Sequence, residues 1–311
     1  MSARTPNLFL IGSMKSGTTY LSELLASHPA IFMCSPKEPC YFTDQRVLRQ
    51  VWRHMWGRGY WRSIDRYLSL FSQAGDVPIV AEASTPYSQV PLFEGVPQRI
   101  LAASPEARFI YLMRDPIERT ISHYWHAVRW WGERRDLVTA IRREPRYVDV
   151  SHYARQLKAY LKCVPRERIH TLTLGELRTQ PIERFRAICA WLGIDPSVVP
   201  QGLGGRVNEM PAVIAQAKGF GLLHQFKYSP LYRRLEPFVP VPARKLGARL
   251  AERAIVAADV DVRGVAAYLR PRMREQTQEL CELLGRRFPE WKTLYGLDEA
   301  GSRSPSPTCW E

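Results

Sequence analysis

Apolar and polar residues follow one another along the chain in blocks that predict alternating strands and helices. The first block, residues 8–11, is continuously apolar and stops at Gly12, which is typical of a buried strand in a parallel sheet. From Thr18 the apolar residues recur at helical spacing on one face, and the helix is predicted to end at His28 and Pro29. Those apolar residues are Tyr20, Leu21, Leu24 and Leu25. The chain therefore begins with a strand, a glycine-containing turn and a helix.

Three later apolar runs predict further strands, and helical patterns separate them. The predicted strands are residues 79–81, 108–113 and 169–174. The predicted helices are one that starts near Pro116, then residues 151–162, 181–192 and 271–287, with short amphipathic helices in the Trp-rich region after residue 31. Strands that alternate with helices favour an α/β fold, an open parallel sheet flanked by helices.

A single domain is predicted over residues 1–300, followed by a flexible Ser/Pro-rich tail over residues 301–311. Within the domain, residues 206–274 form a basic, mostly helical C-terminal extension with 13 Lys and Arg against five Asp and Glu. Three interpretations of this extension stay open: a lid over an active site, an acceptor-binding excursion, or a surface that makes peripheral contact with a membrane.

The overall charge narrows the class of partner. The 311 residues include 44 Lys and Arg against 30 Asp and Glu, which gives a net charge of +14. This surplus favours an anionic partner. Nucleic acid is not expected, because no basic residues are interleaved along a motif that enters a groove.

The sequence predicts neither a metal site nor a membrane-spanning helix. The six cysteines form no C-x-x-C pair and no Cys/His cluster with zinc spacing, and no acidic metal site is seen. The N-terminus does not read as a signal peptide, and no apolar stretch approaches the ~20 residues of a spanning helix. We therefore expect a cytoplasmic protein with free cysteines and no bound metal.

The turn of residues 12–19 is the candidate binding site with the clearest physical basis. Backbone N–H groups in such a turn, together with the N-terminus of the following helix, form a binding site for an anion. Lys15 adds a mobile cation, and Thr18 and Thr19 add hydroxyl groups. In ATP- and GTP-binding loops the lysine follows the second glycine, whereas Lys15 precedes Gly17. This order argues against a nucleoside triphosphatase.

The same turn resembles the 5′-phosphosulfate loop of the sulfotransferases, which use 3′-phosphoadenosine 5′-phosphosulfate (PAPS) and release PAP. The matching residues are Lys15, Ser16, Gly17, Thr18 and Thr19, directly after an apolar strand. The resemblance implies a P-loop-like sheet in which these residues hold the 5′-phosphate. It also implies that Lys15 stabilises the negative charge on the leaving oxygen.

A second segment, residues 111–122, resembles the family's strand, Arg-Asp-Pro turn and helix. The resemblance implies that Arg114 and Ser122 hold the 3′-phosphate, and a guanidinium fork beside a hydroxyl suits a dianionic phosphate. The family also has a late basic loop at the adenine pocket, and the resemblance implies that Arg206, in a glycine-flanked loop, is its counterpart and reaches the same phosphate. An ordinary surface loop is the alternative interpretation of that segment.

Two more segments, residues 36–42 and 82–87, resemble the carbohydrate-type sulfotransferases, which include heparan sulfate enzymes and bacterial relatives. The resemblance covers most of residues 7–295 and is weakest across residues 200–265. It implies that Glu38 is the general base for the acceptor. The chain has Ala83 where heparan-type enzymes often carry a lysine, which argues against a heparan-like acceptor.

Other residues compete with Glu38 for the role of base. Glu82 is the second carboxylate candidate, and His123 and His126 are candidates because cytosolic-type members use histidine. Glu38 could instead pair with the adjacent Lys37.

The sequence thus predicts a PAPS-dependent sulfotransferase that acts without a metal by in-line transfer to a hydroxyl or amine. The acceptor classes left open are carbohydrate, lipid and small molecule, and the oligomeric state is also left open. The alternatives are a P-loop nucleotide kinase or phosphotransferase, and a non-enzymatic protein that binds polyanions.

Overall fold

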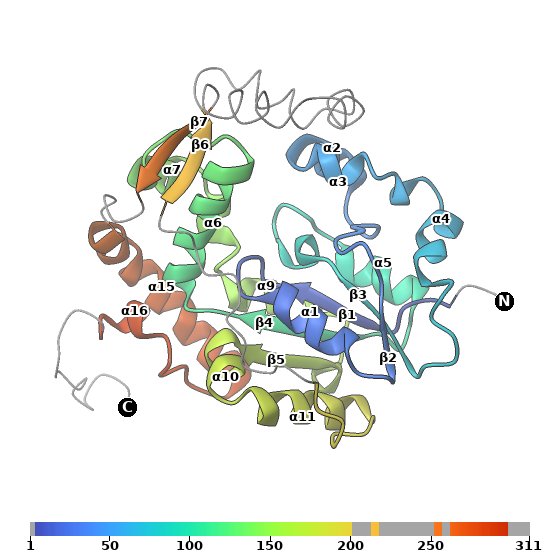
Figure 1. The fold of residues 1–311 in the computed structure, drawn as a ribbon. Helices are drawn as coiled ribbons and strands as arrows, with labels where there is room; N and C mark the ends of the chain where they lie inside the picture. Colours follow the sequence, from blue (N-terminus) through green and yellow to red (C-terminus); the bar gives the residue numbers. More distant parts are fainter. Residues whose placement is uncertain (1–3, 201–212, 218–251, 257–261, 298–311) are drawn as a thin grey trace. The chain divides into compact units, whose positions relative to one another are not determined.

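The computed structural model describes residues 4–200, 213–217, 252–256 and 262–297 (Figure 1). The chain divides into two compact units. The first consists of Met1–Arg119, Asp149–Val207 and Arg270–Glu311, and the second of Thr120–Val148 and Asn208–Leu269. The single domain predicted over residues 1–300 stays a prediction, while Arg206 and the predicted tail lie outside the described residues.

A five-stranded parallel sheet forms the centre of the first unit, in the order β2-β3-β1-β4-β5. The strands are β1 (Leu8–Gly12), β2 (Ile31–Met33), β3 (Ile79–Ala83), β4 (Arg108–Met113) and β5 (Ile169–Thr173). Strand β1 is central and buried along its whole length, as its continuous apolar run predicts. The predicted parallel α/β sheet is therefore confirmed.

Helices and short 3₁₀ turns connect the strands. Those within the first unit are α1 (Thr18–Ala26), α2 (Gln45–Val51), α3 (Arg53–Trp56), η1 (Tyr60–Arg62), α4 (Ile64–Leu68), η2 (Ser69–Phe71), η3 (Thr85–Ser88), α5 (Val96–Ala103), α9 (Tyr153–Leu161), η4 (Arg166–Arg168), α10 (Leu174–Thr179), α11 (Pro181–Leu192) and α16 (Lys292–Tyr295). The chain passes between the units within α6 (Pro116–Trp130), α8 (Arg146–Asp149) and α15 (Val262–Leu284).

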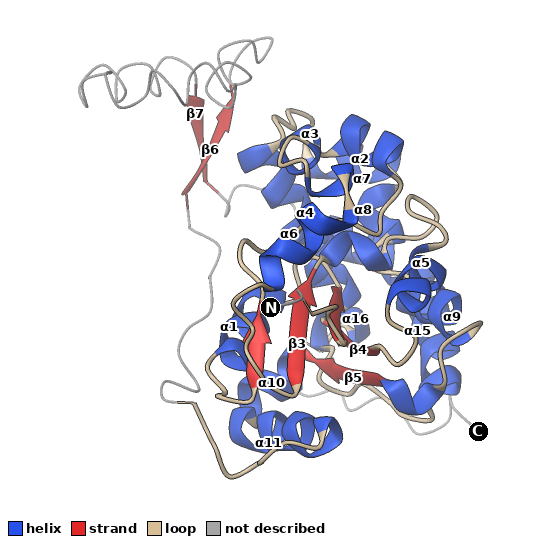
Figure 2. Ribbon diagram, turned by 90° about the vertical axis from the view of Figure 1, so that its right-hand side faces the viewer, coloured by secondary structure: helices blue, strands red, loops and turns tan. Residues whose placement is uncertain are grey.

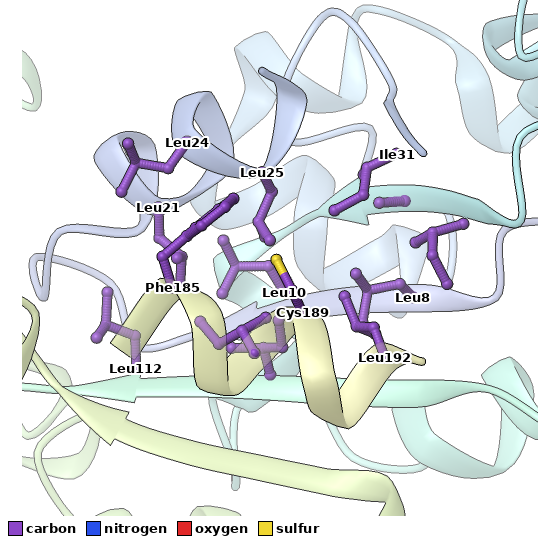
Figure 3. Packing of buried hydrophobic residues seen from close by; sticks show 14 of the residues in the cluster. Leu8, Leu10, Leu21, Leu24, Leu25, Ile31, Leu112, Phe185, Cys189 and Leu192 are labelled. Carbon is purple, nitrogen blue, oxygen red and sulfur yellow. The ribbon is translucent and has the colours of Figure 1, made fainter. Parts of the chain in front are cut away.

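One face of the sheet packs against α1 and α11. Leu8 and Leu10 of β1 point to this face, because successive side chains of a strand alternate between faces. Figure 3 shows them among buried side chains of both helices. These are Leu21, Leu24 and Leu25 of α1, and Phe185, Cys189 and Leu192 of α11. This packing holds the N-terminus of α1 at the end of β1.

The opposite face is aromatic. The ring of Phe9 stacks on Phe109 at 5.8 Å between centroids and meets Phe42 edge-on at 5.9 Å. The ring of Tyr160 of α9 contacts that of Phe109, with 5.1 Å between the ring centroids. Figure 2 shows α5 and α9 on the other side of the sheet from α1 and α11. With both faces covered, the inner strands β1 and β3 are buried along their whole length, and the partly exposed positions lie mainly in the edge strands β2 and β5.

Several elements differ from the sequence prediction, among them β2, α15 and the two strands described below within residues 206–274, which were predicted to be mostly helical. Strand β2 was not predicted, because three residues are too few for a periodic signal, and its pairing with β3 places it. Helix α15 begins at Val262 and contains Pro271, whereas the prediction started at that proline. Buried residues Val265, Ala266 and Leu269 extend the apolar face of the helix upstream of the proline.

The second unit contains most of α6, α7 (Leu137–Arg143) and an antiparallel pair, β6 (Val213–Ala217) and β7 (Glu252–Val256). Within it the ring of His123 contacts Trp131 and Tyr147, with centroids 5.5 and 5.0 Å apart. Among the described helices of the chain, none is both long and apolar enough to cross a bilayer.

Candidate active site

The carboxyl ends of the parallel strands lie at one edge of the sheet, which is where ligands bind in open α/β folds. Gly12 ends β1, Ala83 ends β3 and Met113 ends β4. Glu38 joins this edge because its backbone N–H donates to the carbonyl of Ala83 at 3.0 Å. The topology thus gathers residues from separate parts of the sequence.

The turn between β1 and α1 requires its two glycines. Gly12 has a φ of 150°, and a Cβ there would lie 2.1 Å from Ser88 Oγ. Gly17 has a φ of 93°, and its Cβ would lie 2.8 Å from a Leu174 methyl group. Gly17 is the N-cap of α1 and makes no side-chain cap hydrogen bond, so the N–H groups of the first helical turn suit an anion.

The side chains of this turn are polar and organised. Ser13 Oγ and Ser16 Oγ share a hydrogen bond of 2.5 Å inside the turn. Lys15 adopts a left-handed backbone with a φ of 69°, which is uncommon for a residue with a side chain. Such conformations persist where the surrounding structure holds them, often at functional sites.

Lys37 also reaches the turn, which the sequence analysis did not predict. Its Nζ donates to Thr18 Oγ1 at 2.9 Å and to Thr19 Oγ1 at 3.1 Å. The same ammonium lies 3.8 Å from Glu38 Oε1. One lysine therefore links the candidate phosphate-binding hydroxyls to the candidate base.

Glu38 is held in place by Thr85, the first residue of η3, two positions after the end of β3. Its Oε2 accepts from the Thr85 backbone N–H at 2.8 Å, and its Oε1 accepts from Thr85 Oγ1 at 3.1 Å. The side chain is 15% exposed. Burial raises the pKa of Glu38, and Lys37, Thr85 and Arg58 oppose this rise. A raised pKa suits a residue that must accept and release a proton.

Glu82 has a different environment. Its side chain is 0% exposed, and its oxygens accept hydrogen bonds from the hydroxyls of Tyr67 and of Ser84, the latter at 2.7 Å. Tyr87 also hydrogen-bonds to it. Burial raises the pKa of Glu82 to about 7, against the lowering effect of these hydrogen bonds. Its oxygens face protein hydroxyls, so Glu82 is a weaker candidate than Glu38 for contact with an acceptor.

Arg114 follows β4 in the turn that leads into α6. Its guanidinium donates twice to Glu118 Oε2, from Nε at 3.0 Å and from Nη2 at 2.7 Å. The arginine side chain is 24% exposed, so its guanidinium is oriented by Glu118 and is still accessible to a ligand. The Tyr153 hydroxyl donates to the Arg114 carbonyl at 2.7 Å and also interacts with Ser13 and Ser16. Tyr153 therefore connects the two predicted phosphate-binding turns.

The first unit brings together most of the predicted site residues. They are Lys15, Ser16, Gly17, Thr18, Thr19, Glu38 and Arg114. Ser122, on α6, belongs to the second unit together with His123 and His126, and Arg206 lies outside the described residues. Each role assigned to these residues stays a prediction.

The sequence pattern alone did not place Lys37, Glu118 and Tyr153 at the candidate site. Lys37 lies directly before Glu38, which predicts an ion pair between the two but not the contact of Lys37 with Thr18 and Thr19. Within the described residues, no group of three or more His, Cys, Asp or Glu is arranged to hold a metal ion.

The chain matches the family model of the sulfotransferase domain over residues 5–210. It is 34% identical over 125 residues to the membrane-associated sulfotransferase kil1 of Dictyostelium discoideum, covering 40% of this chain and 24% of that protein. It is 27% identical over 213 residues to the bifunctional heparan sulfate N-deacetylase/N-sulfotransferase 2 of Bos taurus, covering 62% and 22%. The chain thus spans less than a quarter of the length of either relative.

The fold is similar to the crystal structure of a sulfotransferase from Alicyclobacillus acidocaldarius. The two align with a TM-score of 0.63 and 23% identity, over 92% of this chain and 98% of that one. This likeness concerns the fold and extends beyond the segment that matches the family model.

Proposed function

The chain belongs to the sulfotransferase domain family, and we propose that it transfers the sulfuryl group of PAPS to a hydroxyl or amine of an acceptor. One observation carries the proposal. The N-terminus of α1, which has no side-chain cap at Gly17 and carries Thr18 and Thr19, is linked through Lys37 to the mostly buried carboxylate of Glu38. An anion site beside a base is what sulfuryl transfer requires.

The residues present fit a doubly phosphorylated donor. The turn offers backbone N–H groups, two threonine hydroxyls and Lys15 for the 5′-phosphosulfate. Arg114 offers a guanidinium, oriented by Glu118, to the 3′-phosphate. Ser122 and Arg206 are proposed as further partners of this phosphate. When bound, the donor supplies a sulfuryl group on a phosphate leaving group.

The chain's own residues then have two tasks. Glu38 takes the proton from the acceptor hydroxyl or amine as the new bond to sulfur forms. Lys15 stabilises the negative charge on the oxygen that leaves with PAP. We propose that this chemistry proceeds without a metal ion.

Carbohydrate, lipid and small-molecule acceptors all agree with this site. The carbohydrate class is favoured by the likeness to the Bos taurus protein, whose name includes heparan sulfate. Ala83, which is 1% exposed, adds no cation to the site and argues against a heparan-like polyanion. The cytoplasmic location and the membrane contact of residues 206–274 stay predictions.

The decisive experiment compares ligands by thermal stabilisation. PAP is expected to raise the melting temperature, while ATP with Mg²⁺ at the same concentration raises it much less. Stabilisation by ATP with Mg²⁺ and none by PAP would instead favour the P-loop kinase. Transfer from radiolabelled PAPS to a panel of sugars, lipids and phenols then identifies the acceptor, and PAP binding with no transfer to any of them would favour a binding protein.

A further inference from the structure

Lys37 holds both hydroxyls of the first turn of α1 with one ammonium group. Its Nζ lies 2.9 Å from Thr18 Oγ1 and 3.1 Å from Thr19 Oγ1. The lysine side chain is 25% exposed, so it is neither in the core nor on the open surface. Lys37 lies 19 positions after Thr18 in the sequence, and β2 brings the two together.

The chemistry of the donors decides what this contact does. An ammonium has three N–H donors and no acceptor, so both threonine oxygens accept from it. Each hydroxyl proton must then point away from Lys37. The two hydroxyls are thereby arranged as donors, which is the orientation that an anion needs.

The backbone of Lys37 is also anchored. Arg58 Nη1 donates to the carbonyl of Lys37 at 2.6 Å and to that of Glu38 at 3.2 Å. The Lys37 ammonium lies 3.8 Å from Glu38 Oε1, so its charge acts on the base as well. Burial lowers the pKa of Lys37, and the carboxylates of Glu38 and Glu23 oppose this change.

We propose that Lys37 is a positioning residue for sulfuryl transfer. It orients the Thr18 and Thr19 hydroxyls toward the 5′-phosphosulfate and keeps them in a fixed position relative to Glu38. The inference rests on the proposed function and adds to it a residue that acts through its neighbours. Lys15 and Lys37 then have separate tasks: Lys15 stabilises the leaving oxygen, and Lys37 organises the hydroxyl donors.

A double-mutant cycle tests this coupling. Lys37→Met keeps the aliphatic stem and removes the ammonium, and Thr18→Val combined with Thr19→Val removes the hydroxyls. Affinity for PAP, which retains the 5′-phosphate, is measured by calorimetry. Lys37→Met is expected to weaken PAP binding about tenfold in the parent protein. In the valine background the same change is expected to cost less than about threefold, because the hydroxyls through which it acts are absent.

Two further variants separate positioning from folding. Lys37→Arg retains a charged donor and is expected to keep part of the parent protein's affinity for PAP. This expectation can be tested even where Lys37→Met does not fold. Lys162→Met, on the exposed end of α9, is the matched control and should leave PAP affinity unchanged.

The outcomes distinguish the inference from the proposed function. Equal losses from Lys37→Met in both backgrounds, or no loss in either, would overturn the positioning role while PAP binding by the parent protein still supports a sulfotransferase. Lys37→Arg binding PAP no better than Lys37→Met would also count against it. A parent protein that does not bind PAP would overturn the proposed function, and the inference with it.

Discussion

The backbone N–H of Leu294 donates a hydrogen bond of 2.9 Å to Asp115 Oδ2, in the turn that carries Arg114. The other oxygen of Asp115 accepts from the N–H groups of Ile117 and Glu118 at 3.0 and 3.3 Å, which caps α6. The match to the sulfotransferase domain ends at residue 210. The C-terminal part of the chain therefore supports the predicted 3′-phosphate turn from outside the matched segment.

This relationship predicts the effect of Asp115→Ala. The change removes a helix cap and the anchor of Leu294, so a loss of about 2 kcal/mol in the free energy of unfolding is expected. PAP affinity should also fall, because Arg114 loses its fixed turn. Asp136→Ala is the control, since Asp136 caps α7 in a comparable way. A fall in PAP affinity as large for Asp136→Ala as for Asp115→Ala would contradict this account.

Lys15→Ala should abolish most sulfuryl transfer and leave the fold intact. Removal of one preorganised group that stabilises developing charge costs about 10²–10³ in kcat. Single-turnover rates with labelled PAPS measure the effect, and the melting temperature reports the fold. Lys162→Ala is the surface control. Near-normal turnover by Lys15→Ala would remove the role assigned to Lys15.

Glu38→Gln should slow the chemical step and leave cofactor binding nearly unchanged. Loss of a general base costs about 10²–10⁴ in rate, whereas the affinity for PAP should change by less than about twofold. The pKa of Glu38 is raised, so in the parent protein transfer should fall as the pH drops through that raised pKa. Glu106→Gln, with a side chain that is 82% exposed, is the control. An unchanged kcat would move the base to Glu82 or to a histidine.

Glu82 should make the protein less stable as the pH rises. Its carboxyl has a pKa of about 7 when folded, against an ordinary value of 4.5. The folded state therefore binds more protons between these values, and stability contributed at low pH is lost as the pH rises from 4.5 to about 7. The difference in pKa corresponds to about 3 kcal/mol.

Melting temperatures of the parent protein and of Glu82→Gln between pH 4.5 and 8 test this linkage. The variant should show a flatter dependence on pH across that interval, whatever its absolute stability. Glu183→Gln on the surface of α11 should keep the parent's slope. Identical slopes for the parent and Glu82→Gln would mean that the pKa of Glu82 in the folded protein is not raised into this pH interval.

The local sequence pattern was sufficient for the strands with continuous apolar runs. The apolar run before Gly12 and the run of residues 108–113 were predicted as strands and are β1 and β4. Both are buried on two faces, so their composition alone identifies them. Strand β2 has three residues and is defined by hydrogen bonds to β3, which no local window contains.

The sequence by itself determined the parallel α/β class of the sheet and the position of the turn that is predicted to bind phosphate, because each depends on neighbouring residues: apolar runs, and the order of Lys15 and Gly17. Only the tertiary structure decided which distant side chains serve that turn. Lys37 reaches Thr18 because β2 pairs with β3 as an edge strand of the sheet, and Leu294 reaches Asp115 across 179 positions. A hydrogen bond requires that its two groups are close in space. Strand pairing and helix packing bring together residues that are far apart in the sequence, so a local sequence pattern does not predict such contacts.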